Sequence, residues 1–333
     1  MAKPTFTEIA RAAGVGTATV ERVLNGRGGV RPETAERVIA AARALDYPRR
    51  LPEVHRGLLR IEIILVRPET SFYRRLARAF ERIAATLDPV VRVHRTFSKE
   101  DDPAAIAALI ARTEPRRAGL ILAVPVDARI TDAIAGVAPR LPIVHVVTRA
   151  HESIGELVSI DNYAAGRSAA MFIARMGPPA GTVIAVSHHR YEVHHARMRG
   201  FSDYFAEHAP EGRVFRWIGF SRDDRRVAGD LVLEARRRWP DLAGIYNAGG
   251  ANTGLVEALR RDPGARGIFF VGHELTEVTE AALRDGVMDV VLDQAPEAQA
   301  RRALDLMLRR LGLLDIAPDA TPIRFVTITA ENL

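Results

Sequence analysis

The sequence predicts an α/β protein in which a small all-helical N-terminal unit precedes a larger, two-lobed domain with parallel sheets. Residues 5–46 carry amphipathic helical patterns and no strand pattern. From residue 61 onward, short apolar runs alternate with amphipathic helical segments, which is the pattern of α/β domains. Eleven such runs are too many for one ordinary open sheet, so we expect two lobes.

Three short helices are expected in the N-terminal unit. Thr5 and Glu8 have the spacing of a capping box, and Gly14 provides the left-handed residue that often ends a helix. The second helix is expected over Thr17–Leu24 and the third over Pro32–Leu45, with proline in its first turn. The apolar positions expected to face inward are Ile9, Ala10, Ala13, Val20, Val23, Leu24, Val38, Ile39, Ala42 and Leu45.

A connector with Pro48 and Pro52 separates this unit from the strand-forming region. The expected strands are Ile61–Val66, Val90–His94, Ala118–Val124, Ile143–Val147, Leu157–Ile160, Thr182–Val186, Val214–Ile218, Gly244–Tyr246, Ile268–Val271, Val287–Leu292 and Ile323–Ile328. Most of these runs are continuously apolar, which predicts strands that are covered on both faces, as in parallel sheets.

Composition excludes several classes of protein. Apolar residues make up 47% of the chain and charged residues 26%, so the chain is not wholly disordered. The longest uncharged apolar run, about Ala118–Val126, is shorter than the roughly 20 residues of a membrane-spanning helix. The N-terminus lacks a signal-peptide pattern, and the absence of cysteine excludes disulfides and thiolate metal sites. We therefore expect a cytoplasmic protein without a membrane partner.

The net charge of +6 is concentrated at the N-terminus. Residues 1–60 hold 11 Lys and Arg against 6 Asp and Glu, whereas residues 61–333 hold 36 against 35. A basic unit attached to a nearly neutral domain indicates contact with nucleic acid or with a membrane surface. The alternative is compositional bias, because Lys3 and Lys99 are the only lysines. Such bias explains the preference for arginine but not where the surplus lies.

The first two helices, joined by Gly14-Val15-Gly16, fit a helix-turn-helix, whose second helix enters the major groove of DNA. Arg22 can form a bidentate pair with guanine, while Thr17 and Ala18 can contact a base and a thymine methyl group. The candidate DNA-binding residues are Thr5, Thr7, Thr17, Ala18, Thr19, Glu21, Arg22, Asn25 and Arg31. The helix pattern alone leaves a generic three-helix bundle with solvated arginines as the alternative.

Residues 7–26 (TEIARAAGVGTATVERVLNG) and 30–38 (VRPETAERV) closely resemble the DNA-binding headpiece of the lactose repressor family. This resemblance implies a dimeric bacterial transcription regulator in which Thr17, Ala18 and Arg22 read bases. Two positions differ.

Gly16 and Glu21 stand where the family usually has serine. Gly16 is a weaker helix cap than serine, and Glu21 can accept from a cytosine amino group or pair with a neighbouring arginine. The family also has a hinge helix that places a leucine in the minor groove. The candidates for that role here are Leu51, Val54 and Leu58, in a connector that is shorter and carries two prolines.

The remainder resembles the effector domain of the same family, whose two-lobed fold is shared with periplasmic sugar-binding proteins. The segments that carry this resemblance are 119–127, 158–166, 197–201 and 245–247. It implies a headpiece at 1–46, a hinge or linker at 47–60 and an effector-binding domain at 61–333, with one lobe at about 61–159 and 293–320 and the other at about 160–292 and 321–333. In this fold, ligands lie between the lobes at the carboxyl ends of the strands.

The resemblance places ten residues in that cleft: Ser71, Phe72, Asp127, Arg149, His189, Arg197, Phe220, Asn247, Glu274 and Gln294. Carboxylates and amides there would accept bonds from sugar hydroxyls, Arg197 would donate two, and a phenyl ring would cover a sugar face. The alternatives are that Phe72 and Phe220 belong to the core and that Asp127 and Glu274 cap helices. We expect a neutral sugar or polyol as the effector, with a sugar acid or sugar phosphate as the alternative.

Other patterns give no catalytic or metal site. The pairs His188-His189 and His194-His195 have no fixed third ligand, and the glycine-rich stretch 249–254 lacks the lysine of a phosphate loop. Neither a Gly-x-Ser-x-Gly elbow nor a His-Glu-x-x-His motif occurs. We therefore expect no metal, no cofactor and no enzymatic activity.

The sequence thus favours a ligand-responsive repressor that binds double-stranded operator DNA and a small-molecule effector. We expect a homodimer, because the chain ends soon after its last strand without a leucine-heptad tail. The alternatives are a solute-binding protein and a sugar-active cytosolic enzyme on the same fold.

Overall fold

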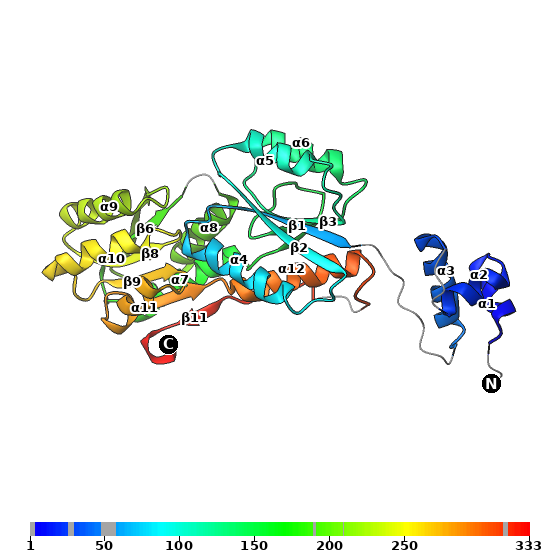
Figure 1. Ribbon diagram of the computed structural model, residues 1–333. Coiled ribbons are helices and arrows are strands. Elements are labelled where there is room, and N and C mark those ends of the chain that lie inside the picture. Colours follow the sequence, from blue (N-terminus) through cyan, green and yellow to red (C-terminus); the bar gives the residue numbers. More distant parts are fainter. Residues whose placement is uncertain (1–3, 26–29, 48–57, 189–190, 209, 316–318) are drawn as a thin grey trace. The chain divides into compact units, whose positions relative to one another are not determined.

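The computed structural model describes residues 4–25, 30–47, 58–188, 191–208, 210–315 and 319–333. The chain forms two compact units, Met1–Leu59 and Arg60–Leu333 (Figure 1). Most of the connector expected at 47–60, including Leu51 and Val54, lies outside the described residues. Within the described part of the chain, no helix combines the length and apolar content needed to cross a membrane.

The N-terminal unit contains the three expected helices, α1 (Phe6–Ala13), α2 (Thr17–Leu24) and α3 (Pro32–Ala44). The capping box is confirmed, because the Thr5 side chain accepts from the Glu8 amide and Glu8 accepts from the Thr5 amide. The expected core is confirmed except at two leucines, and of these Leu24 packs against the core but is only partly buried. Leu45 is 37% exposed because α3 ends at Ala44 and the backbone turns away from the buried face.

All eleven expected strands are present in the second unit. The strands are β1 (Leu59–Val66), β2 (Val91–Ser98), β3 (Gly119–Ala123), β4 (Ile143–Val146), β5 (Glu156–Val158), β6 (Gly181–Ser187), β7 (Arg213–Phe220), β8 (Leu242–Asn247), β9 (Phe269–His273), β10 (Val290–Asp293) and β11 (Val326–Ile328). The helices are α4 (Ser71–Ala84), α5 (Pro103–Ala111), α6 (Ala128–Val137), α7 (Asn162–Met176), α8 (Glu192–His208), α9 (Arg225–Arg238), α10 (Asn252–Arg261), α11 (Glu277–Arg284) and α12 (Pro296–Arg310), with short 3-10 turns η1 (Pro263–Ala265) and η2 (Ala330–Asn332).

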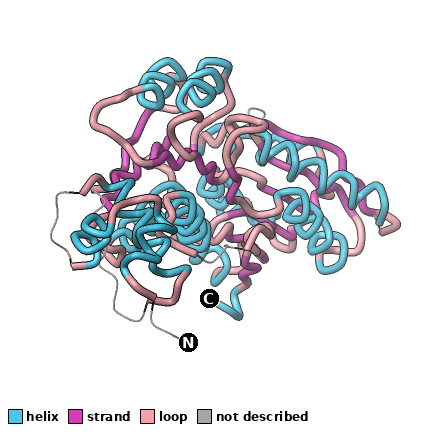
Figure 2. Tube along the Cα trace, turned by 90° about the vertical axis from the view of Figure 1, so that its right-hand side faces the viewer, coloured by secondary structure: helices cyan, strands magenta, loops and turns pink. Residues whose placement is uncertain are grey.

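The strands form two sheets, one in each lobe, and helices flank them (Figure 2). The sheet orders are β2-β1-β3-β4-β5 and β7-β6-β8-β9-β10-β11. The pairings β1–β3–β4–β5 and β7–β6–β8–β9–β10 are parallel. The exception is β11, which runs antiparallel to β10 at the edge of its sheet. Both lobes therefore have a doubly wound order, which places ligands at the carboxyl ends of the strands.

The chain crosses between the lobes three times. It leaves the first sheet between β5 and α7, returns between β10 and α12, and crosses again before β11. Helix α12 packs on α4, β3, β4 and β5, so it belongs to the first lobe although β10 lies in the second. Two of the crossing segments pair through a parallel bridge between Ile160 and Ile323. The two lobes are therefore connected by three chain segments.

Candidate functional site

A cavity of about 750 Å³ lies in the Arg60–Leu333 unit and is lined by both lobes. The first lobe contributes Arg67 after β1, the start of α4, and Val147 and Thr148 after β4. The second lobe contributes residues that follow β7, β8, β9 and β10, together with the first turns of α8. The cavity therefore lies where the topology places a ligand, and its volume suits a small organic molecule.

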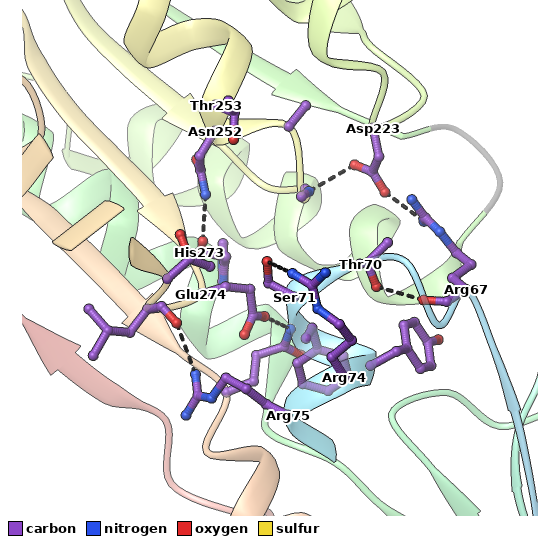
Figure 3. Close-up of a pocket in the computed structure, with 18 of the residues that line it drawn as sticks. Arg67, Thr70, Ser71, Arg74, Arg75, Asp223, Asn252, Thr253, His273 and Glu274 are labelled. Atoms are coloured by element: carbon purple, nitrogen blue, oxygen red, sulfur yellow. Dashed lines mark hydrogen bonds and ion pairs between the residues drawn. The ribbon is translucent and has the colours of Figure 1, made fainter. Parts of the chain in front are cut away.

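Two ion pairs join the lobes at this cavity. Arg67 Nη1 lies 2.8 Å from Asp223 Oδ2, and Asp223 Oδ1 accepts from the Gly250 amide at 2.8 Å (Figure 3). Arg75 on α4 binds Asp293 at the end of β10. Burial opposes the charge of Asp223, yet the neighbouring His194 and Arg67 hold the pKa of its carboxyl below the usual range. Both pairs connect segments that can separate only if the lobes move apart.

The backbone around the cavity is strained. The described non-glycine residues of this unit with positive φ are Arg67, Val147, Arg222, Asp223, Glu274 and Ala295. Four of these six line the cavity, and the other two are chain neighbours of lining residues. For a β-branched residue such as Val147, with φ of 72°, this conformation is a genuine outlier. Each strained residue costs about 1–3 kcal/mol, and such strain clusters at ligand clamps.

Arg197 on α8 is the most deeply buried cation of the cavity, at 2% exposed. Its Nε donates to Asn162 Oδ1 at 2.8 Å and its Nη1 donates to the Ala248 carbonyl at 2.7 Å. No carboxylate among the described residues forms an ion pair with it, and burial lowers its pKa. A buried cation held by neutral acceptors retains donor capacity for a ligand.

Several buried polar atoms beside the cavity have no hydrogen-bond partner among the described residues. They are Oε2 of Glu274, Nδ1 of His273 and the hydroxyl of Tyr191, and all three residues line the cavity. The other carboxylate oxygen of Glu274 accepts from Gln294, and the ring Nε2 of His273 bonds the Tyr246 hydroxyl at 2.9 Å. Buried polar groups are nearly always satisfied, so these atoms indicate a ligand that supplies donors and acceptors.

Replacing Glu274 with glutamine is expected to change how stability depends on pH. Burial and the nearby Asp293 raise the pKa of Glu274 from its usual 4.5 to about 8, whereas Gln294 and the arginines act in the opposite direction. The folded state therefore binds the Glu274 proton more tightly than the unfolded state does. As a result, the free energy of unfolding falls as pH rises from about 4.5 to about 8. Glu274→Gln should match the original chain near pH 5 and exceed its stability near pH 8–9 by about 1–3 kcal/mol. Urea unfolding at both pH values measures this, and identical pH profiles for the two proteins would contradict it.

The structure brings half of the ten expected cleft residues together. The residues that line the cavity are Ser71, Phe72, Arg197, Glu274 and Gln294. His189 lies outside the described residues, although its neighbour Tyr191 lines the cavity. Of the remaining four, Asp127 and Arg149 follow strands and Phe220 and Asn247 are the last residues of β7 and β8, and none of them is part of the lining.

Three of those four residues make local hydrogen bonds instead, and the fourth is half exposed. Asp127 caps α6 by accepting from the Arg129 amide at 2.9 Å, which is the alternative role weighed above. Arg149 donates to two carbonyls of the following loop, Phe220 is half exposed at the end of β7, and Asn247 bonds within the loop after β8. Asp127, Arg149 and Asn247 therefore use their polar atoms in local contacts near strand ends.

Sequence reasoning missed other cavity residues, of which the main ones are Arg67, Tyr73, Arg75, His194, Asp223 and Asn252. Arg67 directly follows β1, and this position alone could have predicted that it lines the cavity. The partners Asp223 and Asp293 lie 156 and 218 residues away from Arg67 and Arg75, and no local pattern connects them.

In the N-terminal unit, α2 presents a mixed face. Thr17, Ala18 and Arg22 are exposed, whereas Val20 and Val23 are buried against the other helices. The remaining candidates are exposed (Thr5, Thr7, Asn25 and Arg31) or half-buried (Thr19 and Glu21). This arrangement leaves the residues expected to read bases accessible at the start of a helix that follows a tight turn.

Two family models match the chain. Residues 5–49 match the model of bacterial regulatory proteins of the lacI family. Residues 61–312 match the periplasmic binding protein domain. Catabolite control protein A of Staphylococcus xylosus is 34% identical over 103 residues, which span 29% of this chain and only 30% of that protein.

Solved structures resemble the larger unit. An ABC transporter solute binding protein of Actinobacillus succinogenes with bound D-allose has a TM-score of 0.73 and 16% identity, covering 82% of this chain and 98% of that chain. The glucose-galactose binding protein GanP of Geobacillus stearothermophilus has a TM-score of 0.73 and 17% identity, covering 84% and 99%. Similarity at this level of identity establishes the shared two-lobed fold.

Proposed function

Because the chain belongs to the lacI family of bacterial regulatory proteins and carries a periplasmic binding protein domain, we propose that it is a ligand-responsive repressor that binds a near-palindromic operator as a dimer. The exposed face of α2 supports this proposal, since Thr17, Ala18 and Arg22 are free to meet base edges. Its action on DNA places it in the cytoplasm.

The effector of this regulator is a sugar, a polyol or a derivative of one. The single observation that supports this most strongly is the set of unsatisfied polar atoms on Glu274, His273 and Tyr191 beside the buried Arg197. A polyhydroxylated molecule offers donors and acceptors in the number that these atoms require. Solved proteins of the same fold hold D-allose and D-arabinose, which agrees with this ligand class.

Binding rather than turnover is the proposed role of the cavity. A ligand that contacts both Arg67 of the first lobe and Asp223 of the second would favour one lobe arrangement over another. Such differential affinity is the requirement for ligand-dependent control of DNA binding.

Replacing Arg22 with alanine tests the DNA-reading role. The full chain should bind a DNA fragment from its own promoter region, and Arg22→Ala should weaken that binding about 5–150-fold, because a bidentate base contact contributes about 1–3 kcal/mol. The control is Arg43→Ala, which removes one positive charge from an exposed position on α3. Gel-shift titration at one fixed salt concentration measures both variants. If both variants lost the same affinity, and lost it equally for operator and for unrelated DNA, Arg22 would not be reading bases.

A further inference from the structure

Arginines and carboxylates both line the cavity, and some of the arginines have no carboxylate partner among the described residues. The arginines that line it are Arg67, Arg74, Arg75, Arg78, Arg197 and Arg225, and the carboxylates are Glu69, Asp223, Glu274, Glu277 and Glu280. Among the described residues, three of these arginines have carboxylate partners. Arg67 contacts Asp223, Glu100 and Glu69, Arg75 contacts Asp293 and Glu297, and Arg225 contacts Glu257.

The other three arginines, Arg74, Arg78 and Arg197, form no ion pair within the described part of the chain. Besides Asp223, two of the lining carboxylates lie close to an arginine. Glu280 pairs with Arg284, and Glu69 lies 3.8 Å from Arg67.

Glu277 is exposed and forms no ion pair among the described residues. The carboxyl of Glu274 holds a hydrogen bond from Gln294, and burial raises its pKa to about 8, so it is mostly protonated at neutral pH. The positive charge that has no carboxylate partner among the described residues is therefore local, at Arg74, Arg78 and Arg197.

Two of these unpaired arginines lie on α4. Arg74 and Arg78 are one helical turn apart and thus share a face of α4. Arg74 Nη2 lies 3.4 Å from Ser71 Oγ, in the first turn of this 14-residue helix (Figure 3). The N-cap Thr70 makes no side-chain capping bond, so the first-turn amides have no side-chain acceptor. Hydroxyl, amide and guanidinium donors are thus gathered at one place.

A second observation that indicates a ligand is Arg197, which lines the same cavity from the second lobe. It is 2% exposed and has no carboxylate partner among the described residues. Two of its three nitrogens are already engaged with Asn162 and Ala248. It is therefore suited to hold a hydroxyl or carbonyl oxygen, whereas an anion with several oxygens finds more free donors at Ser71, Arg74 and Arg78.

We propose that the effector is an anionic sugar derivative, a sugar acid or a sugar phosphate, whose charged group binds at Ser71, Arg74 and Arg78 while its hydroxyls face Arg197 and Glu274. This inference rests on the proposed function and names the chemical class of its ligand. Carboxylate and phosphate share the recognition chemistry of oxygen anions.

Isothermal titration calorimetry of the full-length chain tests the proposal. Each of a panel of hexoses and pentoses is offered in three forms: the neutral sugar, its aldonate and its terminal phosphate. We expect one anionic form to bind at least about tenfold tighter than the neutral sugar of the same skeleton, with a preference that falls as salt rises. Preference for the aldonate assigns a carboxylate, and preference for the phosphate ester assigns a phosphate.

The double variant Arg74→Gln/Arg78→Gln should remove this preference. The control is Arg82→Gln, on the same helix but 65% exposed and outside the cavity lining, which should retain the preference. A neutral sugar that binds as tightly as its anionic forms would overturn the anion site and leave the proposed function standing. If no member of the panel binds or changes operator affinity, both the anion site and the proposed effector class are wrong.

Discussion

Replacing Glu62 with alanine is expected to lower the free energy of unfolding of the 60–333 unit by about 3–5 kcal/mol. Glu62 lies in β1 and is completely buried. Its carboxylate accepts from Thr96 at 2.7 Å, from Arg112 at 2.5 Å and from Arg117 at 3.0 Å. These partners come from β2 and from the loop before β3, so one carboxylate holds three segments together.

The large effect follows from what the substitution leaves behind. The Arg117 side chain is itself buried, and it also donates to the carbonyls of Leu109 and Ile110. Alanine at position 62 would leave this guanidinium as a buried charge without a counterion, which costs more than the net contribution of the original pair. Truncation of one partner is therefore far more destabilising than replacement of the whole cluster by apolar residues.

Urea unfolding followed by circular dichroism measures the effect. The matched control is Glu81→Ala, because Glu81 also pairs with an arginine, Arg95 at 3.1 Å, but is 61% exposed. An exposed pair of this kind contributes at most about 1 kcal/mol. A loss of stability for Glu62→Ala that is no larger than for the control would contradict the role of the buried cluster.

The acid side of the stability curve should change as well. Burial alone would raise the pKa of Glu62, but the bonds from Thr96, Arg112 and Arg117 outweigh burial and lower it. Its stabilising contribution is therefore fully present above the usual value of 4.5 and is lost as pH falls through the lower folded-state pKa. The difference between Glu62→Ala and the original chain should accordingly shrink in acid.

The fold was predictable because burial on both faces leaves a strong pattern. The run Ile61–Val66 reads as a strand although it contains Glu62, since five apolar residues surround one charge. The same pattern says nothing about how that charge is neutralised. Arg112 and Arg117 lie 50 and 55 residues away, and only the folded sheet brings them to Glu62.

Those residues of the candidate site that lie just after the carboxyl end of a strand could be predicted from the sequence. Ser71, Glu274 and Gln294 follow β1, β9 and β10, and all three line the cavity. Asn247 is the last residue of β8, but its amide nitrogen donates locally, to the Gly249 carbonyl and to Asn252. Position after a strand therefore selects candidates, and local hydrogen bonds decide which of them remain available to a ligand.

Replacing Gly166 with alanine is expected to disconnect ligand binding from DNA binding. A Cβ atom at position 166 on α7 would lie 1.9 Å from the carbonyl oxygen of Arg197 on α8, closer than real Cβ contacts. Gly200 on α8 makes the reciprocal approach, with its Cβ position 2.1 Å from the Tyr163 carbonyl oxygen. The two helices therefore cross in backbone contact, and only glycine at both positions permits this.

This crossing positions the buried guanidinium of Arg197. Its Nε reaches Asn162 Oδ1, on the facing α7, at 2.8 Å. Alanine at position 166 would force α7 and α8 apart by more than about 1 Å, since ordinary carbon contacts lie near 3.5–4.0 Å. We expect a loss of about 1–3 kcal/mol or more in unfolding free energy, from overpacking, together with the loss of ligand binding.

Operator binding should survive this substitution, because Gly166 lies in the second unit and the base-reading candidates lie in the first. Calorimetry with the ligand found in the sugar panel and gel shifts of the same preparation measure the two activities separately. Gly136→Ala on α6, where an added Cβ meets nothing within 4 Å, controls for the loss of a helical glycine. Asn162→Ala removes the acceptor of Arg197 without a clash, so it should weaken ligand binding with a smaller loss of stability. If Gly166→Ala bound the ligand as the original chain does, close packing of α7 against α8 would not be what positions Arg197.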